Sequence, residues 1–283
     1  MQKPEVMLTA LDYANIAAVA AVQLSGQKVR LVLGQRNQFT KESYNYSGWR
    51  DKQIVPTLRY FYQQADAIAC VSKGVAADLT ASLDLDADQV HAIYNVVTTE
   101  ALLAQANEPL DHPWFQDDKI PVLLAAGKLK QQKDYVTLLE AFSIVVKARD
   151  SRLVVLGQGP LKSDLEQLSC RLGLKDKVWF AGFVDNPFKY MRNADLFVLS
   201  SVFEGLPGVL IQALACGCPV VSTDCQADHT KYLMAASMDN LFQSGTHLRW
   251  RRLSCVNFIP GVLQSFCRTA AGFFQKRMRQ EII

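Results

Sequence analysis

Short runs of apolar residues, rich in Val, Leu and Ile, alternate with longer amphipathic stretches along most of the chain. Several of these runs are bounded by Gly, Ser or Asn, and apolar runs of this length are typical of parallel strands buried on both faces. The expected strands lie at residues 6–11, 29–34, 67–72, 90–95, 122–127, 152–157, 178–182, 196–200 and 219–223.

The stretches between these runs have the spacing of amphipathic helices. Residues 135–148 and 161–174 keep apolar side chains at helical intervals and place charged side chains on the other face. Because strand and helix alternate, the sequence predicts an α/β protein with parallel sheets and right-handed crossovers.

A break in this alternation predicts two domains. Residues 105–119 combine prolines with acidic side chains, which is typical of an interdomain linker. About four strand–helix units precede this stretch and five strands follow it. We therefore expect an N-terminal α/β domain over residues 1–106, a linker over 107–119 and a C-terminal α/β domain over 120–225, followed by a tail over 226–283.

The composition narrows the class of protein. The 283 residues are 49% hydrophobic and 20% charged, which fits a globular protein and excludes a disordered or fibrous one. The formal net charge of +3 is too small to indicate nucleic acid or an anionic membrane as the principal partner. The first residues have no basic start, and Asp12 and Asn15 interrupt their apolar stretch, so they form neither a signal peptide nor a membrane span.

The seven cysteines show no metal-ligand spacing and indicate reduced thiols of a cytosolic protein. Cys216 and Cys218 stand close enough to share a metal ion, but no second pair or nearby His completes four ligands. We therefore expect both to be buried thiols.

A candidate anion site follows the expected strand at residues 122–127. Gly127 ends this strand, and Lys128 and Lys133 lie in the loop before a helix that begins near Asp134. Backbone N–H groups at a helix N-terminus, together with two ammonium groups, suit a diphosphate. The alternative interpretation is a pair of solvated lysines at a helix start.

A second candidate follows the expected strand at residues 196–200. Glu204 stands directly before a Gly-x-Pro turn, and a helix is expected to begin near Pro207. Ligands of open α/β sheets bind beyond the carboxyl ends of the strands, where this carboxylate would project. It could accept hydrogen bonds from two sugar hydroxyls. In the alternative interpretation, it interacts only with the helix dipole.

These motifs, in this order, resemble the retaining, nucleotide-sugar-dependent glycosyltransferases of family 4 (group 1). The resemblance covers most of residues 4–225 and is carried by IYNVV (93–97), AAGKLKQQKDYVTLLEAF (125–142), LVVLGQGP (153–160) and VWFAGFVDNPFKYMRNADLFVLSSVFEGLPGVLIQALACGCPVVSTDC (178–225). It implies the GT-B fold of two Rossmann-like domains. The N-terminal domain, which would be partial in this chain, lies on the acceptor side, and the C-terminal domain binds the nucleotide sugar.

Carried over residue by residue, the resemblance implies that Glu204 holds the donor sugar and that Lys133 and Lys128 act on the diphosphate. Lys128 replaces the usual Arg and so lacks its bidentate fork. Gln212 replaces the second Glu of the family motif, so its ribose contact lacks charge assistance. The implied donor-binding positions are Gly127, Gly157, Gly159, Phe183, Val184, Gly205, Leu206, Gly208 and Gln212. For Phe183, ordinary core packing and contact with the base are both open.

The implied reaction is a hexosyltransferase-like transfer, with retention, from a UDP- or GDP-sugar to a glycan or lipid-linked acceptor in polysaccharide biosynthesis. The nucleotide sugar is a substrate, so no cofactor is expected. No metal is expected if Lys128, Lys133 and helix N-termini stabilise the leaving diphosphate. The resemblance also implies a cytoplasmic protein, with peripheral contact at the inner face of the membrane as an option and no nucleic-acid partner.

Both ends of the chain depart from the family pattern. The N-terminal domain of the family opens with a strand and a glycine-rich loop, and we expect this chain to begin after them. After Cys225 the resemblance stops. Read one base earlier from Gln226, the genetic code permits the peptide PSGPYEILDGGKYGQLVPVGDALAMAEA in place of residues 226–253, which is what the resemblance leads one to expect. We therefore expect a one-base frame error there.

Two other functions stay open at this stage. A Rossmann-type NAD enzyme needs Gly-x-Gly-x-x-Gly after its first strand, and the turn from Gly157 to Pro160 lacks the third glycine. The other alternative is an inactive, non-catalytic remnant that still binds a nucleotide sugar. Such a remnant differs from the enzyme only by its altered ends.

Overall fold

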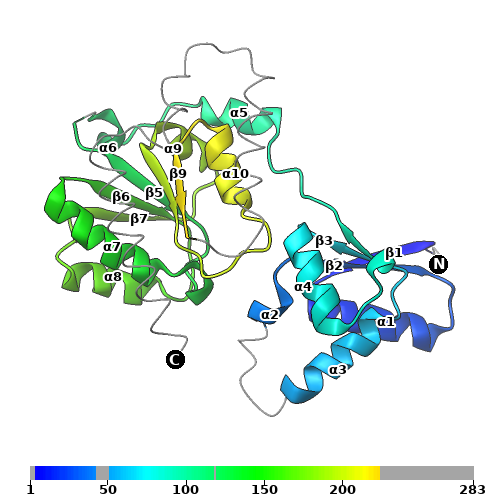
Figure 1. Cartoon of the computed structure of the whole chain (residues 1–283). Helices are drawn as coiled ribbons and strands as arrows, with labels where there is room; N and C mark the ends of the chain where they lie inside the picture. Colours follow the sequence, from blue (N-terminus) through cyan, green and yellow to red (C-terminus); the bar gives the residue numbers. More distant parts are fainter. Residues whose placement is uncertain (1–3, 43–50, 118, 224–283) are drawn as a thin grey trace. The chain divides into compact units, whose positions relative to one another are not determined.

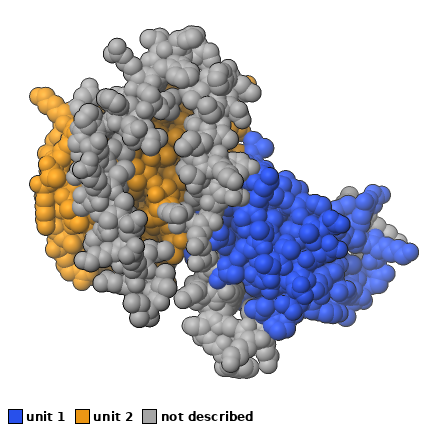
Figure 2. All heavy atoms as spheres, in the orientation of Figure 1, with its two compact units in different colours: residues 1–96, 203–207, 226–230 blue, residues 97–202, 208–225, 231–283 orange. Residues whose placement is uncertain are grey.

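The computed structural model describes residues 4–42, 51–117 and 119–223. The expected frame change and tail lie outside these residues. The described chain forms two compact units, coloured separately in Figure 2. Of the described residues, unit 1 holds those up to Val96 together with Phe203–Pro207, and unit 2 holds Val97–Val202 together with those from Gly208 to Thr223.

Unit 1 is built on a four-stranded parallel sheet, which we call sheet A. Its strands lie in the order β1-β2-β3-β4. The elements are β1 (Val6–Ala10), α1 (Asp12–Ser25), β2 (Arg30–Gln35), α2 (Phe39–Glu42), α3 (Asp51–Tyr62), β3 (Ala67–Cys70), α4 (Lys73–Leu83), the 3-10 turn η2 (Ala87–Gln89) and β4 (Val90–Ala92).

The core of unit 1 lies on one face of sheet A. Alternate strand residues point to this face, and they pack against α1, α3 and α4. These strand residues are Leu31, Leu33, Ile68 and Cys70, each at most 4% exposed. On β1, by contrast, Leu8 is 71% exposed. An apolar residue in this strand is therefore not always buried.

A buried polar network joins the carboxyl ends of β1 and β2 to the helices. The Tyr62 hydroxyl accepts a hydrogen bond from the Asn15 amide at 2.8 Å and lies 2.9 Å from oxygens of both Asp12 and Gln35. Burial raises the pKa of Asp12, and the hydrogen bond from Tyr62 partly offsets this. Because the hydroxyl has one hydrogen, it can donate to only one of the two oxygens at a time.

Unit 2 is built on a five-stranded parallel sheet, which we call sheet B. Its strand order is β7-β6-β5-β8-β9. The elements are α5 (Glu100–Ala106), α6 (Pro113–Gln116), β5 (Val122–Ala126), the 3-10 turn η3 (Gln131–Lys133), α7 (Tyr135–Ala148), β6 (Arg152–Leu156), α8 (Lys162–Arg171), β7 (Val178–Gly182), α9 (Phe188–Asn193), β8 (Leu196–Leu199), α10 (Gly208–Ala215) and β9 (Val220–Ser222).

Both faces of sheet B are covered, as Figure 1 shows for unit 2. On β5, Leu123 packs with α7 and α8, whereas Leu124 packs with α5, α9 and α10. Successive side chains of a strand point to opposite faces of the sheet, and both faces are covered by helices. Every strand position therefore enters a hydrophobic core, which explains why the strands are continuously apolar. All the expected strands are present, and the prediction of parallel α/β architecture is confirmed.

The two helices expected in unit 2 are also present, although one ends early. The predicted helix at 135–148 is α7, with the same limits. The helix expected to reach residue 174 ends at Arg171, because Gly173 adopts a left-handed conformation (φ 71°) and turns Leu174 into the core. Cys216 and Cys218 are buried thiols, as expected.

The segment before β5 is anchored by stacked rings. His112 stacks on Trp179 with ring centroids 4.1 Å apart, and its Nδ1 accepts a hydrogen bond from the backbone N–H of Trp114 at 3.2 Å. Burial lowers the pKa of His112, with a smaller contribution from Arg152. The neutral imidazole that this favours is the form that can accept the bond.

We predict that Phe142→Ala lowers the free energy of unfolding by about 3–5 kcal/mol, because this side chain is fully buried against sheet B. Phe183→Ala removes the same side chain from a position that is 68% exposed and should change stability by at most about 0.5 kcal/mol. Urea unfolding followed by tryptophan fluorescence would measure both. Equal losses would show that the α7 core is not as tightly packed as described.

Candidate functional site

Sheet B has a topological switch point between β5 and β8. The chain runs outward from β5 through β6 to β7, then returns to the other side of β5 as β8. Connections that leave neighbouring strands in opposite directions diverge at the carboxyl edge, which is where open α/β sheets bind ligands. The two candidate loops, containing Lys133 and Glu204, follow β5 and β8.

The loop after β5 places Lys133 against Gly127. A Cβ built on Gly127 would lie 3.3 Å from Cε of Lys133. The Tyr135 hydroxyl donates to the carbonyl oxygen of Gly127 at 3.2 Å, and the Ser200 hydroxyl donates to that of Lys133 at 2.6 Å. The backbone of Lys133 is therefore held by Ser200 at its carbonyl and by Lys130, whose carbonyl accepts the Lys133 N–H at 3.0 Å.

The N-terminus of α7 carries its own acidic cap. Asp134 adopts a left-handed conformation (φ 44°), and its carboxylate accepts hydrogen bonds from the backbone N–H of Thr137 at 3.2 Å and from its hydroxyl at 2.6 Å. The Thr137 amide is thus satisfied within the protein. The loop carries three lysines, of which Lys128 is exposed and Lys130 and Lys133 are half-buried.

Two glycines let the loop after β6 pack directly on the loop after β5. A Cβ on Gly157 would overlap the carbonyl oxygen of Gly127, and one on Gly159 would overlap the backbone of Leu129. Close approach is accompanied by a hydrogen bond from the Leu129 N–H to the Gln158 carbonyl at 2.9 Å. Any side chain at these glycines would push the loops apart.

The loop after β7 joins the same edge. The Gly157 N–H donates to the carbonyl oxygen of Gly182 at 2.7 Å, which places Phe183 one residue away. The Phe183 side chain is 68% exposed, so the core-packing interpretation is wrong. Val184 is half-buried and packs with the cluster on the α9 and α10 face. An exposed ring at this edge is available to stack on a planar ligand.

The loop after β8 begins in unit 2. The Val202 N–H donates to the Gln132 carbonyl at 2.9 Å, in the same turn as Lys133. Glu204 follows two residues later, so its Cα lies within about 7 Å of that of Val202 along the chain. Glu204 is 7% exposed, which excludes a fully solvated carboxylate. With Gly205 and Leu206, it belongs to Phe203–Pro207, the segment assigned to unit 1.

Two further predicted positions lie on α10. Gly208 is the first residue of this helix and Gln212 lies one turn later, half-buried. Unit 2 therefore contains Gly127, Lys128, Lys133, Gly157, Gly159, Phe183, Val184, Gly208 and Gln212, whereas Glu204, Gly205 and Leu206 lie in unit 1. Hydrogen bonds link the loops after β5, β6, β7 and β8 to one another.

The described residues contain no group of three or more His, Cys, Asp or Glu side chains arranged to hold a metal ion. Across the same part of the chain, none of the helices combines the length and apolar character that crossing a membrane requires.

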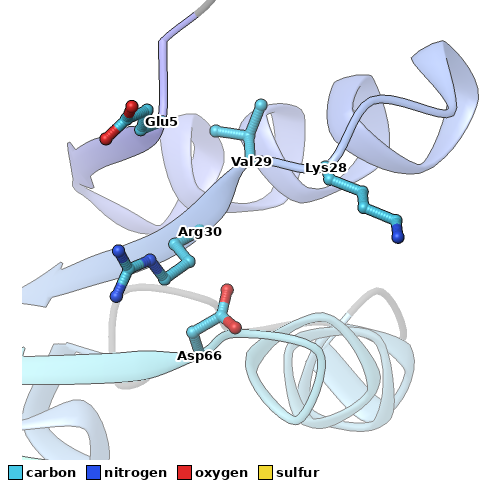
Figure 3. A pocket seen from close by; sticks show the side chains of 5 residues that line it. All are labelled: Glu5, Lys28, Val29, Arg30 and Asp66. Carbon is cyan, nitrogen blue, oxygen red and sulfur yellow. The ribbon is translucent and has the colours of Figure 1, made fainter.

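A charged pocket lies at the edge of sheet A where its strands begin, which is the edge away from their carboxyl ends (Figure 3). It is lined by Glu5, Lys28, Val29, Arg30 and Asp66, which lie at or just before the amino ends of β1, β2 and β3. Asp66 has a structural role there, because its carboxylate accepts the Leu31 N–H at 2.7 Å. Ligands of open α/β sheets bind at the other edge, so we do not assign this pocket to the site.

Sequence reasoning missed the residues that hold the loops in place. Ser200 and Tyr135 fix the turn around Lys133 through backbone carbonyls. The signal for Ser200 was a hydroxyl residue directly after a strand, at the edge where parallel sheets bind ligands. No pattern in the sequence marked the partner carbonyl of Ser200, since it lies 67 residues away.

Two family models match the chain. The model described as Glycosyltransferase Family 4 matches residues 2–101, and the one described as Glycosyl transferases group 1 matches residues 120–243.

Two of the curated relatives above 30% identity match more than three quarters of this chain. An uncharacterized glycosyltransferase of Methanocaldococcus jannaschii is 31% identical over 233 residues, 79% of this chain and 56% of its own length. The N-acetylgalactosamine-N,N'-diacetylbacillosaminyl-diphospho-undecaprenol 4-alpha-N-acetylgalactosaminyltransferase of Campylobacter jejuni is 34% identical over 219 residues, 76% of this chain and 56% of its own length. The chain thus spans about half the length of these relatives.

Among solved structures, HepE from Anabaena in complex with UDP-glucose aligns with a TM-score of 0.65 at 14% identity, over 98% of this chain and 78% of that one. At this identity the likeness concerns the fold alone. Such neighbours have the GT-B fold, so the fold expected from the sequence is confirmed.

We predict that Gly159→Ala lowers the free energy of unfolding by about 2–3 kcal/mol, because its Cβ would overlap the Leu129 backbone. Gly173→Ala is the matched control. Its φ of 71° disfavours a side chain, but no atom lies within 4 Å of the added Cβ, so the cost should be about 1 kcal/mol. Urea unfolding of both variants measures the difference. Equal costs would argue against the close loop contact.

Proposed function

We propose a sugar-transfer function for this chain, which belongs to the group 1, family 4 glycosyltransferases. The proposed donor is a UDP- or GDP-sugar. One observation carries the proposal: Lys133 is fixed against Gly127 at the switch point of sheet B. A diphosphate placed there would contact the ammonium group of Lys133. Because the backbone of Lys133 is already ordered, binding would cost little conformational entropy of the loop.

The donor sugar is assigned to Glu204. Glu204 lies in the loop that follows β8, one of the two strands at the switch point of sheet B. A largely buried carboxylate can accept hydrogen bonds from two hydroxyls of a sugar, and in such a setting these bonds are strong. The exposed ring of Phe183 is assigned to the nucleotide base, and Gln212 to the ribose.

We propose transfer of a hexose with retention of the anomeric configuration. As the bond between the sugar and the diphosphate breaks, negative charge grows on the leaving diphosphate. Lys133 and Lys128 would offset this charge, so that preorganised cations rather than a metal ion stabilise the departure.

The proposed acceptor is a glycan or a lipid-linked sugar, as in polysaccharide biosynthesis. The Campylobacter relative is named for a diphospho-undecaprenol acceptor, which supports a lipid-linked substrate for this chain as well. The solved complex of HepE with UDP-glucose supports a UDP-sugar donor. A cytoplasmic location, with peripheral contact at the inner face of the membrane, would bring the chain to such acceptors.

We predict that Lys133→Ala weakens binding of UDP or GDP by about 1.5–3 kcal/mol, the range for losing a hydrogen bond to a charged group. Lys147→Ala, in the last turn of α7, removes an exposed lysine away from the loop and should leave the affinity unchanged. Calorimetric titration of both nucleotides measures this. Unchanged affinity of the Lys133 variant for both nucleotides would contradict the assignment of Lys133 to the diphosphate.

We predict that Glu204→Ala weakens binding of UDP-glucose or GDP-mannose by about 1.5–3 kcal/mol while sparing UDP and GDP, because the carboxylate would contact only the sugar. Gln212→Ala is the comparison variant: a ribose contact is present in both kinds of ligand, so both affinities should fall together. If the Glu204 variant lost affinity equally for the sugar-bearing and free nucleotides, its assignment to the sugar would be wrong.

A further inference from the structure

The loop that carries Glu204 is held by residues far away in sequence. Although β8 and α10 lie in unit 2, the intervening Phe203–Pro207 belongs to unit 1. The Ser72 hydroxyl donates a hydrogen bond to the carbonyl oxygen of Gly205 at 2.9 Å, across 133 residues of sequence. Gly205 directly follows Glu204, so this bond fixes the peptide next to the proposed sugar ligand.

The Ser72 side chain is buried and makes two hydrogen bonds. It is 2% exposed and is the N-cap of α4, where its hydroxyl oxygen also accepts the Val75 N–H at 3.2 Å. A single hydroxyl thus caps a helix and binds the loop. Because the hydroxyl is anchored by the helix, its hydrogen is directed at Gly205.

A second contact holds the loop from the other side. A Cβ on Gly205 would overlap the carbonyl oxygen of Arg36 and lie 2.8 Å from its carbonyl carbon, so only glycine allows this approach. The next residue, Leu206, packs against the hydrophobic core of unit 1. The loop is therefore fixed by a hydrogen bond, a close backbone contact and an apolar anchor.

We propose that Ser72 is a positioning residue for Glu204 and that, with the Arg36 backbone, it sets the conformation of the donor-sugar loop. The inference rests on the proposed function, since Glu204 must be the sugar ligand. No contact of Ser72 with the donor is proposed. It acts by restricting the peptide after Glu204, so that the carboxylate is held in one orientation before the sugar binds.

The test compares affinities for UDP and UDP-glucose, and for GDP and GDP-mannose, by calorimetric titration of the full chain. In whichever pair the wild type prefers the sugar-bearing ligand, Ser72→Ala should reduce that preference about five- to tenfold and leave the affinity for the free nucleotide within about twofold. Ser72→Thr keeps a hydroxyl that can both cap and donate, and it should restore the wild-type preference.

Thr99→Ala serves as the control for loss of a helix cap. The Thr99 hydroxyl caps α5 by accepting the Leu102 N–H at 3.2 Å, as Ser72 caps α4. This variant should lower the melting temperature without changing the preference for the sugar-bearing ligand. If it changed the preference as much as Ser72→Ala does, the effect would be one of general stability and the positioning role would be overturned.

Gly205→Ala tests the same loop with Ser72 intact, and it replaces Ser72→Ala if that variant does not fold. It should cause the same selective loss, because the loop must move away from Arg36. An unchanged preference in the folded Ser72 or Gly205 variants, with the preference lost in Glu204→Ala, would overturn the positioning role alone. An unchanged preference in Glu204→Ala would instead overturn the proposed function on which it rests.

Discussion

Close backbone packing at the carboxyl edge of sheet B is the constraint on which the site depends. The loops after β5 and β6 approach so closely that a side chain on Gly157 or Gly159 would overlap the opposing backbone. The Leu129–Gln158 hydrogen bond closes this contact, and the Ser200–Lys133 bond ties it to the end of β8. The lysine proposed to bind diphosphate is thereby ordered without a ligand.

A different kind of constraint governs the loop that carries Glu204. Its shape depends on Ser72 and on the Arg36 backbone, which come from the first third of the chain. Helices cover both faces of sheet B, which explains why its strands are continuously apolar. Ser72, the N-cap of α4, explains how the irregular loop that carries Glu204 is ordered. The backbone carbonyls of Lys133 and Gly205 accept the hydrogen bonds that order the two loops, and these loops carry the residues proposed to bind the donor.

The sequence was most informative where a local pattern determines the structure. The apolar runs placed every strand of sheets A and B, because burial on both faces of sheet B removes the polar alternation. Glycines at strand ends were also recognisable, as at Gly127 and Gly157, since a tight turn after a strand requires them. The family resemblance then supplied the expected GT-B fold, which the structural neighbours confirm.

Long-range contacts could not be predicted in this way. Ser200 and Lys133 are 67 positions apart in the sequence, and Ser72 and Gly205 are 133 positions apart. Contacts over such separations leave no periodic pattern in the sequence. The interpretation of Phe183 was open for the same reason, because its exposure depends on how the loop after β7 meets Gly157. The left-handed Asp134, which caps α7 with its own carboxylate, was recognised only as a helix start.

The central claim is that the carboxyl edge of sheet B, at its switch point, binds the diphosphate of a nucleotide sugar. A crystal structure of the chain with UDP tests it most directly. The account predicts the diphosphate beside Gly127, with Nζ of Lys133 about 2.8 Å from a phosphate oxygen. A diphosphate bound instead at the amino edge of sheet A, among Lys28, Arg30 and Asp66, or one with no contact to Lys133, would contradict it.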